Sequence, residues 1–314
     1  MRCLITGGAG FIGSNLVETL LDRGWEVTVL DDLSTGKREN IASFTAGSRF
    51  RLIVGSIVER AVCERACEGA DYVFHEAALC SVPLSISEPE RTLATNVGGT
   101  ANVFLAARDA GVKRVVWASS TSVYGNSPLL PNRETMPLRP LSPYAASKAA
   151  GEMLASAFSE VYGFPIISLR YFNVFGKRQD PFSAYAAVIP LFVSKLLRDE
   201  RPVIYGDGGQ TRDFVHVENV VEANIRAALH AGNDASGQAF NIGCGERISI
   251  NVLSRIIAEE LGSDLNPEYA PPRPGEVRDS VADISAARDA FGYEPSVDLR
   301  EGLNRSLAWY KENL

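Results

Sequence analysis

The glycine-rich stretch Thr6–Ser14 limits the possible folds of this chain more than any other feature of the sequence. The apolar run at residues 3–5 predicts a buried strand before it, and residues 15–23 predict an amphipathic helix after it. Glycines at such a junction leave backbone N–H groups at a helix N-terminus, where a pyrophosphate can approach closely. The stretch is therefore a candidate dinucleotide-binding loop.

The spacing of the glycines fits two nucleotide-binding patterns. Gly8, Gly10 and Gly13 satisfy G-x-G-x-x-G, while Gly7, Gly10 and Gly13 satisfy the wider G-x-x-G-x-x-G. Either pattern alone is weak, because a glycine-rich turn does not have to bind a ligand. The assignment of a dinucleotide site thus depends on the residues beyond the loop.

An acidic residue stands at the position that a dinucleotide site requires. The next predicted strand, residues 26–30, ends at Asp31, about 20 residues beyond the glycines, where a carboxylate can bind the adenosine ribose hydroxyls. This acid favours NAD over NADP because it would repel a 2′-phosphate. Lys37 and Arg38 lie just downstream and leave the opposite preference open.

Length, charge and cysteine content exclude several classes of protein. The 314 residues allow one large α/β domain and a smaller lobe. A net charge of −7 argues against a nucleic-acid or anionic-membrane binder, so a polyanionic substrate would need local positive groups. The five cysteines lack paired C-x-x-C spacing, which predicts neither a disulfide framework nor a metal site and favours the cytoplasm. We expect no signal peptide and no membrane span.

Strand-like and helical segments alternate after the loop, which predicts βαβ units. The further segments expected to be strands are 50–54, 71–75, 114–118 and 166–169, and those expected to be helices are 59–67, 92–110 and 143–162. Parallel strands with right-handed crossovers form a doubly wound sheet, and ligands bind beyond the carboxyl ends of its strands. The predicted fold class is α/β, a Rossmann-type doubly wound parallel sheet with a smaller α/β C-terminal substrate lobe.

Small residues follow two of the predicted strands. Ser56 and Ile57 follow the third strand, and Ala77 and Ala78 follow the fourth, so a ring or a phosphate could lie against the backbone there. His75 stands at a buried strand end without an acidic partner that the sequence reveals. We predict that it is a packed structural histidine with no chemical role.

Tyr144 and Lys148 are candidate catalytic residues. Ser142 and Pro143 are suited to the N-cap and first turn of a helix, on which Tyr144 and Lys148, four residues apart, share one face. A free tyrosine has a pKa of about 10, and a nearby ammonium together with a cationic nicotinamide ring would favour the phenolate. The alternative is an exposed pair that only aids solubility. The hydroxyl cluster at residues 119–122 after a predicted strand favours the catalytic interpretation.

These motifs in combination resemble the extended short-chain dehydrogenase/reductases. Within them the chain is similar to the NAD-dependent nucleotide-sugar epimerase/dehydratase family, most closely to its UDP-N-acetylglucosamine 4-epimerases and the related UDP-glucose 4-epimerases. The resemblance covers nearly the whole chain. The segments that carry it are Thr6–Gly13, Asp31, His75–Ala78, Asn96–Thr100, Ser120–Gly125, Tyr144–Lys148 and Arg170–Gly176.

The resemblance implies a specific catalytic mechanism. Tyr144 would remove the O4 proton of a UDP-hexose while C4 gives a hydride to tightly bound NAD, and the hydride would return to the opposite face of a 4-keto sugar. Lys148 would bind the nicotinamide ribose, and Ser120 would hydrogen-bond the sugar O4, with Thr121 and Ser122 as plausible helpers. The enzyme would therefore be an isomerase that acts on a UDP-sugar.

The resemblance also implies a set of cofactor contacts. Ser56 stands where the family commonly has an aspartate for the adenine amino group, so weaker adenine contacts are expected. The implied cofactor-binding residues are Gly7, Gly10, Phe11, Ile12, Gly13, Asp31, Asp32, Ser34, Thr35, Gly36, Ser56, Ile57, Ala77, Ala78, Asn96, Ser119, Tyr144, Lys148 and Tyr171.

The substrate contacts implied by the resemblance lie mostly in the C-terminal half. Arginine suits phosphate oxygens, and a small residue at position 280 would leave room for an acetamide. Cys80 and Leu84 differ from the glycine and arginine expected in N-acetyl-selective members. The implied substrate-binding residues are Ser81, Val82, Ser120, Thr121, Ser122, Tyr144, Asn173, Ala187, Val188, Val203, Tyr205, Arg212, Arg273, Glu276 and Ser280.

The family pattern further implies two units and a homodimer. Residues 1–175, with 214–242 returning, would form the NAD-binding domain, while 176–213 and 243–314 would form the nucleotide-sugar-binding lobe. The helices expected at 92–110 and 143–162 would pair between subunits. No nucleic acid or membrane partner is expected.

Other functions stay open. A nucleotide-sugar 4,6-dehydratase would resemble cases with an Asp-Glu pair after the strand-five hydroxyl, where this chain has Thr121 and Ser122. Epimerisation of UDP-glucuronate, or another dehydratase or reductase reaction, is a nearer alternative. A non-catalytic NAD-sensing regulator belongs to a different class, and such proteins typically lack the tyrosine and lysine present here.

Overall fold

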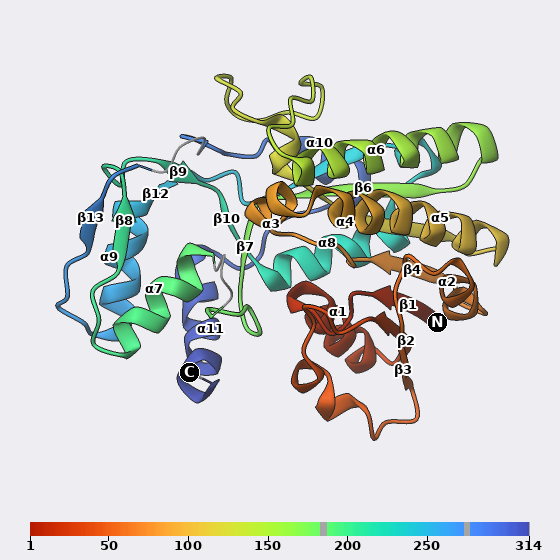
Figure 1. Cartoon of the computed structure of the whole chain (residues 1–314), viewed down its shortest axis with the longest axis horizontal. Coiled ribbons are helices and arrows are strands. Elements are labelled where there is room, and N and C mark those ends of the chain that lie inside the picture. The colour runs from red at the N-terminus through yellow and green to blue at the C-terminus, as the bar shows by residue number, and fades with distance from the viewer. Residues whose placement is uncertain (183–186, 273–276, 314) are drawn as a thin grey trace.

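A seven-stranded parallel sheet forms the centre of the protein (Figure 1). The computed structural model describes residues 1–182, 187–272 and 277–313. The strands lie in the order β11–β6–β5–β4–β1–β2–β3, so the strand order reverses between β1 and β4. This confirms the predicted doubly wound fold. The strands are β1 (Arg2–Thr6), β2 (Glu26–Asp31), β3 (Phe50–Val54), β4 (Tyr72–His75), β5 (Arg114–Ser120), β6 (Ile166–Tyr171) and β11 (Ala239–Ile242).

Helices cover both faces of this sheet, and the sheet separates two apolar cores. Leu16 and Val220, from two helices that pack together on one face, belong to one core cluster. Cys63 and Val103, from the other face, belong to a second cluster. The helices concerned are α1 (Phe11–Asp22) and α8 (Val217–His230) on the first face, and α2 (Arg60–Cys67), α5 (Thr100–Asp109) and α6 (Pro143–Tyr162) on the second. Figure 1 shows α5 and α6 side by side along the sheet.

The helix expected at 92–110 is interrupted. The structure has α4 (Pro89–Leu93), then a π-helical turn η3 (Ala94–Gly99), and only then α5. A Cβ at Gly99 would lie 2.7 Å from two side-chain atoms of Ile57, so the wider turn packs backbone against that side chain. Such π-turns occur often at functional sites.

Strands β5 and β6 extend further than predicted. The pairing of β5 with β6 continues through Ser119↔Arg170 and Ser120↔Tyr171, so the strands end at Ser120 and Tyr171. Backbone pairing between neighbouring strands, which apolar patterning does not reveal, sets these ends. Ser120 therefore lies at the carboxyl edge of the sheet, with the side chain of Tyr171 beside it in register.

A third apolar core lies in the C-terminal half, at the side where Figure 1 places α7, α9 and α11. These helices are α7 (Val188–Leu197), α9 (Ile250–Leu261) and α11 (Leu299–Asn313). Three small sheets accompany them: β7 (Asn173–Phe175) with β10 (Phe214–His216), β8 (Val203–Tyr205) with β13 (Glu268–Ala270), and β9 (Thr211–Arg212) with β12 (Ile248–Ser249).

The remaining elements are short. They are η1 (Arg38–Asn40), η2 (Ala42–Phe44), α3 (Val82–Ser87), η4 (Thr121–Tyr124), η5 (Asn233–Ala235) and α10 (Ser285–Phe291). Although the predicted lobe 243–314 includes α10, this helix packs against α8 and β11 of the large sheet. The division of the chain into two units stays a prediction. Within the described ranges, no helix has the length and apolar content needed to span a bilayer.

A buried ion pair connects α6 to the sheet. The guanidinium of Arg170 on β6 contacts the Glu152 carboxylate on α6 at 2.7 Å, and both side chains are at most 8% exposed. Ser119 on β5 donates a hydrogen bond to Glu152 at 2.5 Å. Arg170 also donates to the hydroxyl of Tyr124 at 2.7 Å. These bonds set the position of α6 relative to the ends of β5 and β6.

Replacing Glu152 with Gln should lower the free energy of unfolding by about 3 kcal/mol or more, because Arg170 would keep its buried charge without a counterion. Urea denaturation followed by circular dichroism measures this change. Glu160→Gln, on an exposed position of the same helix, is the control and should change stability by no more than about 0.5 kcal/mol. Equal effects of the two substitutions would contradict a role for the ion pair.

Candidate functional site

A cavity of about 550 Å³ lies at the carboxyl ends of β1, β2, β4, β5 and β6, beside the reversal in strand order. Most of the predicted cofactor residues line it, together with the three predicted catalytic residues and three predicted substrate residues, two of which are also catalytic candidates. The predicted residues that line this cavity are Gly7, Gly10, Phe11, Ile12, Gly13, Asp31, Asp32, Ser34, Thr35, Gly36, Ile57, Ala77, Ala78, Ser119, Ser120, Tyr144, Lys148, Tyr171 and Ala187.

The glycine loop packs too closely for side chains at two positions. Gly7 has φ +69°, and a Cβ there would lie 2.7 Å from the backbone nitrogen of Ala77. A Cβ at Gly13 would lie 2.2 Å from the carbonyl oxygen of Gly7. The loop is thus folded tightly on itself and against the end of β4, and it leads into α1 with Gly10 as N-cap. Its position suits a phosphate at the helix N-terminus.

Asp31 is held in a defined orientation at the end of β2. Its carboxylate accepts hydrogen bonds from the backbone N–H groups of Ala9 at 2.9 Å and Leu33 at 2.8 Å. Burial raises the pKa of Asp31, and these two hydrogen bonds oppose that rise. A carboxylate fixed in this way suits the binding of ribose hydroxyls.

The three predicted catalytic residues come together from α6 and the end of β5. The ammonium of Lys148 donates a hydrogen bond to the Ala118 carbonyl at 2.6 Å and lies 6.0 Å from the ring centre of Tyr144. The hydroxyl of Ser120 accepts from the backbone N–H of Ser122 at 3.2 Å. At the start of α6, Ser142 accepts from the backbone N–H of Ala145 at 3.1 Å, as its predicted N-cap role requires.

Burial governs the electrostatics of this pair. It raises the pKa of Tyr144 well above its usual range, while hydrogen bonding with Ser120 acts in the opposite direction. Burial also lowers the pKa of Lys148, whose ammonium donates to the Ala118 carbonyl. The expected effect of Lys148 together with a cationic nicotinamide ring on the pKa of Tyr144 stays a prediction. Forming the phenolate requires additional positive charge in the cavity.

Two predicted cofactor residues do not line the cavity. The Asn96 amide is buried and bonds to both backbone groups of Leu79 and to the Ser147 hydroxyl, at 2.8 to 3.1 Å. It thereby orients the chain that follows β4. Ser56 lies between two lining residues, and its hydroxyl accepts from the backbone N–H of Val58 at 3.4 Å. Contact of Asn96 and Ser56 with a cofactor stays a prediction.

Some predicted sugar contacts also lie outside the cavity lining. Ser81 caps α3 by accepting from the backbone N–H of Leu84 at 3.1 Å, and Val82 follows it on the surface. Thr121 and Ser122 form the turn η4 after β5. The Ser122 hydroxyl is buried and has no hydrogen-bond partner within the described parts of the chain.

A second cavity of about 260 Å³ adjoins the first, since Val174 and Ala187 line both. The predicted substrate residues that line it are Asn173, Ala187, Val188, Val203, Tyr205 and Arg212. The Arg212 guanidinium donates to the carbonyls of Thr211 and Arg278 at 2.9 and 3.0 Å. Ser280 is buried and pairs through its backbone N–H with the Thr211 carbonyl, away from this lining. Arg273 and Glu276 lie outside the described residues.

Sequence reasoning assigned no role to several residues that line the larger cavity. Glu76 directly follows β4, a position that the strand pattern already marked as close to a ligand. Cys80, which the resemblance had already linked to sugar selectivity, lies on the same segment and also lines the cavity. Arg178, Gln179 and Asp180 reach the cavity from beyond β7, and only the folded chain brings them there.

His75 is packed as predicted. It is fully buried, and its two ring nitrogens contact the hydroxyls of Thr6 and Thr100 at 2.6 and 2.9 Å. Burial lowers the pKa of His75 to about 3, so the ring is neutral. Neutral His75 therefore contributes no positive charge next to Lys148.

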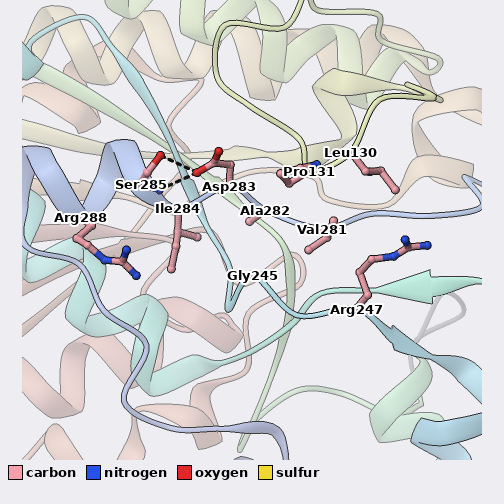
Figure 2. A pocket seen from close by; sticks show the side chains of 10 residues that line it. All are labelled: Leu130, Pro131, Gly245, Arg247, Val281, Ala282, Asp283, Ile284, Ser285 and Arg288. Atoms are coloured by element: carbon pink, nitrogen blue, oxygen red, sulfur yellow. Dashed lines mark hydrogen bonds between the residues drawn. The ribbon is translucent and has the colours of Figure 1, made fainter.

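A separate hollow of about 530 Å³ lies near α10 (Figure 2). Its guanidinium groups are already paired, Arg247 with Asp279 at 3.2 Å and Arg288 with Glu294 at 3.4 Å. Asp283 there accepts two hydrogen bonds from Ser285. None of the predicted site residues that the structure describes lines this hollow. In the described ranges, no group of three or more His, Cys, Asp or Glu side chains could hold a metal ion.

Residues 3–243 match the profile of the NAD dependent epimerase/dehydratase family, which covers more than half of the chain. The chain belongs to this family. Family membership confirms the predicted resemblance and identifies NAD as the cofactor. The glycine loop, the oriented Asp31 carboxylate and the cationic Lys148 fit such a dinucleotide.

Known members are similar over the whole length. A UDP-glucose 4-epimerase of Mycolicibacterium smegmatis is 41% identical over 313 residues, covering 99% of each chain. A UDP-N-acetylglucosamine 4-epimerase from Methanobrevibacter ruminantium M1, solved with UDP-N-acetylmuramic acid, is 41% identical with a TM-score of 0.94, covering 100% of this chain and 99% of that one. The Thermotoga maritima UDP-glucose 4-epimerase, solved with UDP-glucose, is 38% identical with a TM-score of 0.93 and the same coverage.

An ion pair connects the two sides of the larger cavity at its exposed edge. Lys37, beside the end of β2, contacts Asp180 at 2.9 Å, and their side chains are 49% and 32% exposed. The neighbouring Arg178 donates to the backbone carbonyl of Ser14 at 3.2 Å and pairs with Glu18 at 3.0 Å. The segment 177–180 is thus attached to the glycine-loop helix and to the loop after β2.

Breaking the Lys37–Asp180 pair should speed the release of NAD. Lys37→Ala or Asp180→Ala should raise the dissociation rate of NAD by about two- to fivefold, because an exposed pair contributes at most about 1 kcal/mol. Exchange of isotope-labelled NAD measures this rate. The charge-exchanged double variant Lys37→Asp/Asp180→Lys should restore slow release, and high salt should speed release from the wild type more than from either single variant. If the double variant still releases NAD as fast as the single variants do, the electrostatic explanation is refuted.

Proposed function

We propose that this protein catalyses NAD-dependent epimerisation at C4 of a UDP-hexose through a transient 4-keto sugar. Family membership and the activities named for its relatives support this function. The observation that carries it is the convergence of Ser120, Tyr144 and Lys148 on the cavity that also contains the glycine loop and Asp31. The protein is thus an isomerase in which the cofactor ends each turnover in its starting state.

The roles of the protein groups follow from their positions. The tyrosinate form of Tyr144 acts as the base for the sugar O4–H, and the resulting hydroxyl returns the proton to O4 at the end of the reaction. Ser120 orients O4, and Lys148 adds positive charge that favours the tyrosinate. NAD, when bound, supplies the acceptor for the C4 hydride and gives the hydride back. Tyr144, buried at this site, would ionise more readily beside the positive charge of the nicotinamide ring.

The adjoining smaller cavity would hold the UDP group. Asn173 and Tyr205 lie on its wall, and Arg212 brings a guanidinium suited to phosphate oxygens. Arg273 and Glu276 remain proposed contacts to phosphate and uridine ribose. In this arrangement residues 1–175 and 214–242 serve NAD, while 176–213 and 243–314 serve the nucleotide sugar. The sugar ring would lie where Val174 and Ala187 line both cavities, so that its C4 atom faces the catalytic residues.

The preferred substrates are the pairs UDP-glucose/UDP-galactose and UDP-GlcNAc/UDP-GalNAc. The structure places Ser280 outside both cavity linings, so acceptance of the acetamide rests on the family resemblance. UDP-glucuronate 4-epimerisation, or another nucleotide-sugar dehydratase or reductase reaction, is the alternative on the same scaffold. The five cysteines are all free, which fits the reducing cytoplasm that we propose as its compartment.

Proton NMR of the purified holoprotein without added NAD tests this function. UDP-glucose, UDP-GlcNAc and UDP-glucuronate are supplied in turn, and at least one of the first two should give its C4 epimer without net oxidation. Tyr144→Phe should lower the rate about 10²- to 10⁴-fold while NAD stays bound, because only the proton transfer is lost. A 4-keto-6-deoxy product would instead identify a dehydratase, and turnover of UDP-glucuronate alone would identify the other epimerase. No turnover of any sugar, with NAD binding intact, would favour a sensor.

We also propose that two copies of the chain form a homodimer through the predicted helical segments 92–110 and 143–162, and that the contact includes α3, α4 and α6. Large apolar side chains are exposed on these neighbouring helices: Ile86 is 65% exposed, Leu93 43% and Met153 64%. The three helices pack against one another within the chain. A second copy would cover this apolar surface.

Met153→Glu should convert the dimer to a monomer, because each interface would bury an unpaired carboxylate. Light scattering at micromolar concentration measures the mass. Leu129→Glu is the control, since Leu129 is also 64% exposed but lies in the loop before α6. A wild-type monomer at that concentration, or dissociation by the control as well, would contradict the proposed interface.

A further inference from the structure

The larger cavity contains a carboxyl group that the proposed mechanism does not use. Glu76 follows β4 and lines the same cavity as Ser120, Tyr144 and Lys148. The hydroxyl of Tyr171, at the end of β6, donates a hydrogen bond to Glu76 Oε1 at 2.8 Å. A fixed carboxylate therefore lies at the catalytic end of a site built for a dinucleotide.

The direction of that hydrogen bond is determined by a buried amide. Asn224, fully buried on α8, donates from Nδ2 to the Tyr171 hydroxyl oxygen at 2.8 Å and to the Val220 carbonyl at 2.9 Å. Because the tyrosine oxygen already accepts from this amide, its own proton is directed to Glu76. The hydrogen-bond chain from Asn224 through Tyr171 thus ends in a hydroxyl donor. An ionised Glu76 carboxylate is a strong acceptor for that donor.

The charges around Glu76 are few. Lys148 on α6 is the cation that interacts with it, while Cys80 lies on the segment after β4 and Tyr171 on β6. The buried His75 next to it is neutral. Burial raises the pKa of Glu76 to about 7, and the Tyr171 hydrogen bond and Lys148 oppose that rise. Lys148 and Glu76 are therefore the opposing charges at the catalytic end.

We propose that Glu76 is a positioning residue that sets the balance between the oxidised and reduced forms of the bound nicotinamide. This inference rests on the proposed function. In the first half-reaction the C4 hydride moves to the cofactor and the O4 proton moves to Tyr144, so the nicotinamide ring changes from cationic to neutral. A carboxylate in the same low-dielectric cavity stabilises the cationic form and not the neutral one. Glu76 therefore restricts accumulation of NADH together with a 4-keto sugar that could escape.

Relative binding of the two cofactor forms tests this role without any turnover. The holoprotein is equilibrated with an excess of equimolar NAD and NADH until the bound cofactor has exchanged, and the bound ratio is read by chromatography. Glu76→Gln, which keeps an oxygen for the Tyr171 hydrogen bond, should shift the bound NADH/NAD ratio about tenfold toward NADH. By the thermodynamic cycle, tenfold corresponds to about 30 mV in the two-electron potential of the bound cofactor.

Two control variants separate charge from structure. Asp22→Asn removes an exposed carboxylate at the end of α1, outside the cavity lining, and should shift the ratio less than threefold. Tyr171→Phe removes the hydrogen bond but leaves the Glu76 charge, so its shift should also be smaller than that of Glu76→Gln. If Glu76→Gln does not retain a cofactor, Glu76→Ser carries the same prediction. Equal shifts from Glu76→Gln and Tyr171→Phe would indicate a structural role and refute the proposal.

The pH dependence gives a further readout. Glu76 is ionised above its pKa of about 7, so the difference between wild type and Glu76→Gln should be full above that pH and lost as pH falls below it. An unchanged NADH/NAD ratio in Glu76→Gln, with epimerisation intact, would refute the inference alone. Absence of NAD binding in the wild type would instead refute the proposed function.

Discussion

The buried pair between Arg170 and Glu152 is the interaction on which the site depends. Glu152 lies one helical turn beyond Lys148 on α6, and Arg170 lies on β6 beside Ser119 in register. The carboxylate bonds to both Arg170 and Ser119. With Lys148 bonded to the Ala118 carbonyl, the helix is held over the end of β5 at several points. Removing one partner of such a buried pair lowers the free energy of unfolding far more than the loss of an exposed ion pair does.

The cavity exists because glycines, which have no side chain, occupy the turn between β1 and α1. Gly7 and Gly13 bring the loop between β1 and α1 close to the end of β4, where Ala77 follows Glu76. The strand order reverses at this point, so the loops after β1 and β4 diverge and leave space beyond the sheet. Backbone N–H groups, the Asp31 carboxylate and the Lys148 ammonium then surround that space. Binding and chemistry thus share one edge of the sheet.

Burial gives the polar groups of this edge their chemical character. It raises the pKa of Tyr144 and of Glu76 and lowers that of Lys148, so it disfavours the charged form of each of these groups. A cationic cofactor ring changes this balance in favour of both the tyrosinate and the carboxylate. The same low polarity that hinders ionisation in the protein alone makes the cofactor charge effective when it is bound.

The amino-acid sequence alone predicted the sheet class, the glycine loop, Asp31 and the pairing of Tyr144 with Lys148, because these depend on short-range spacing and on strand and helix periodicity. It did not reveal the π-turn at Ala94–Gly99 or the chain from Asn224 through Tyr171 to Glu76. Nor did it reveal the approach of residues 178–180 to the glycine-loop helix. These features are visible only in the folded protein, because their partners are separated by dozens of residues or more along the chain and meet through packing. The pKa of Tyr144 belongs to the same group, since burial is a property of the whole fold.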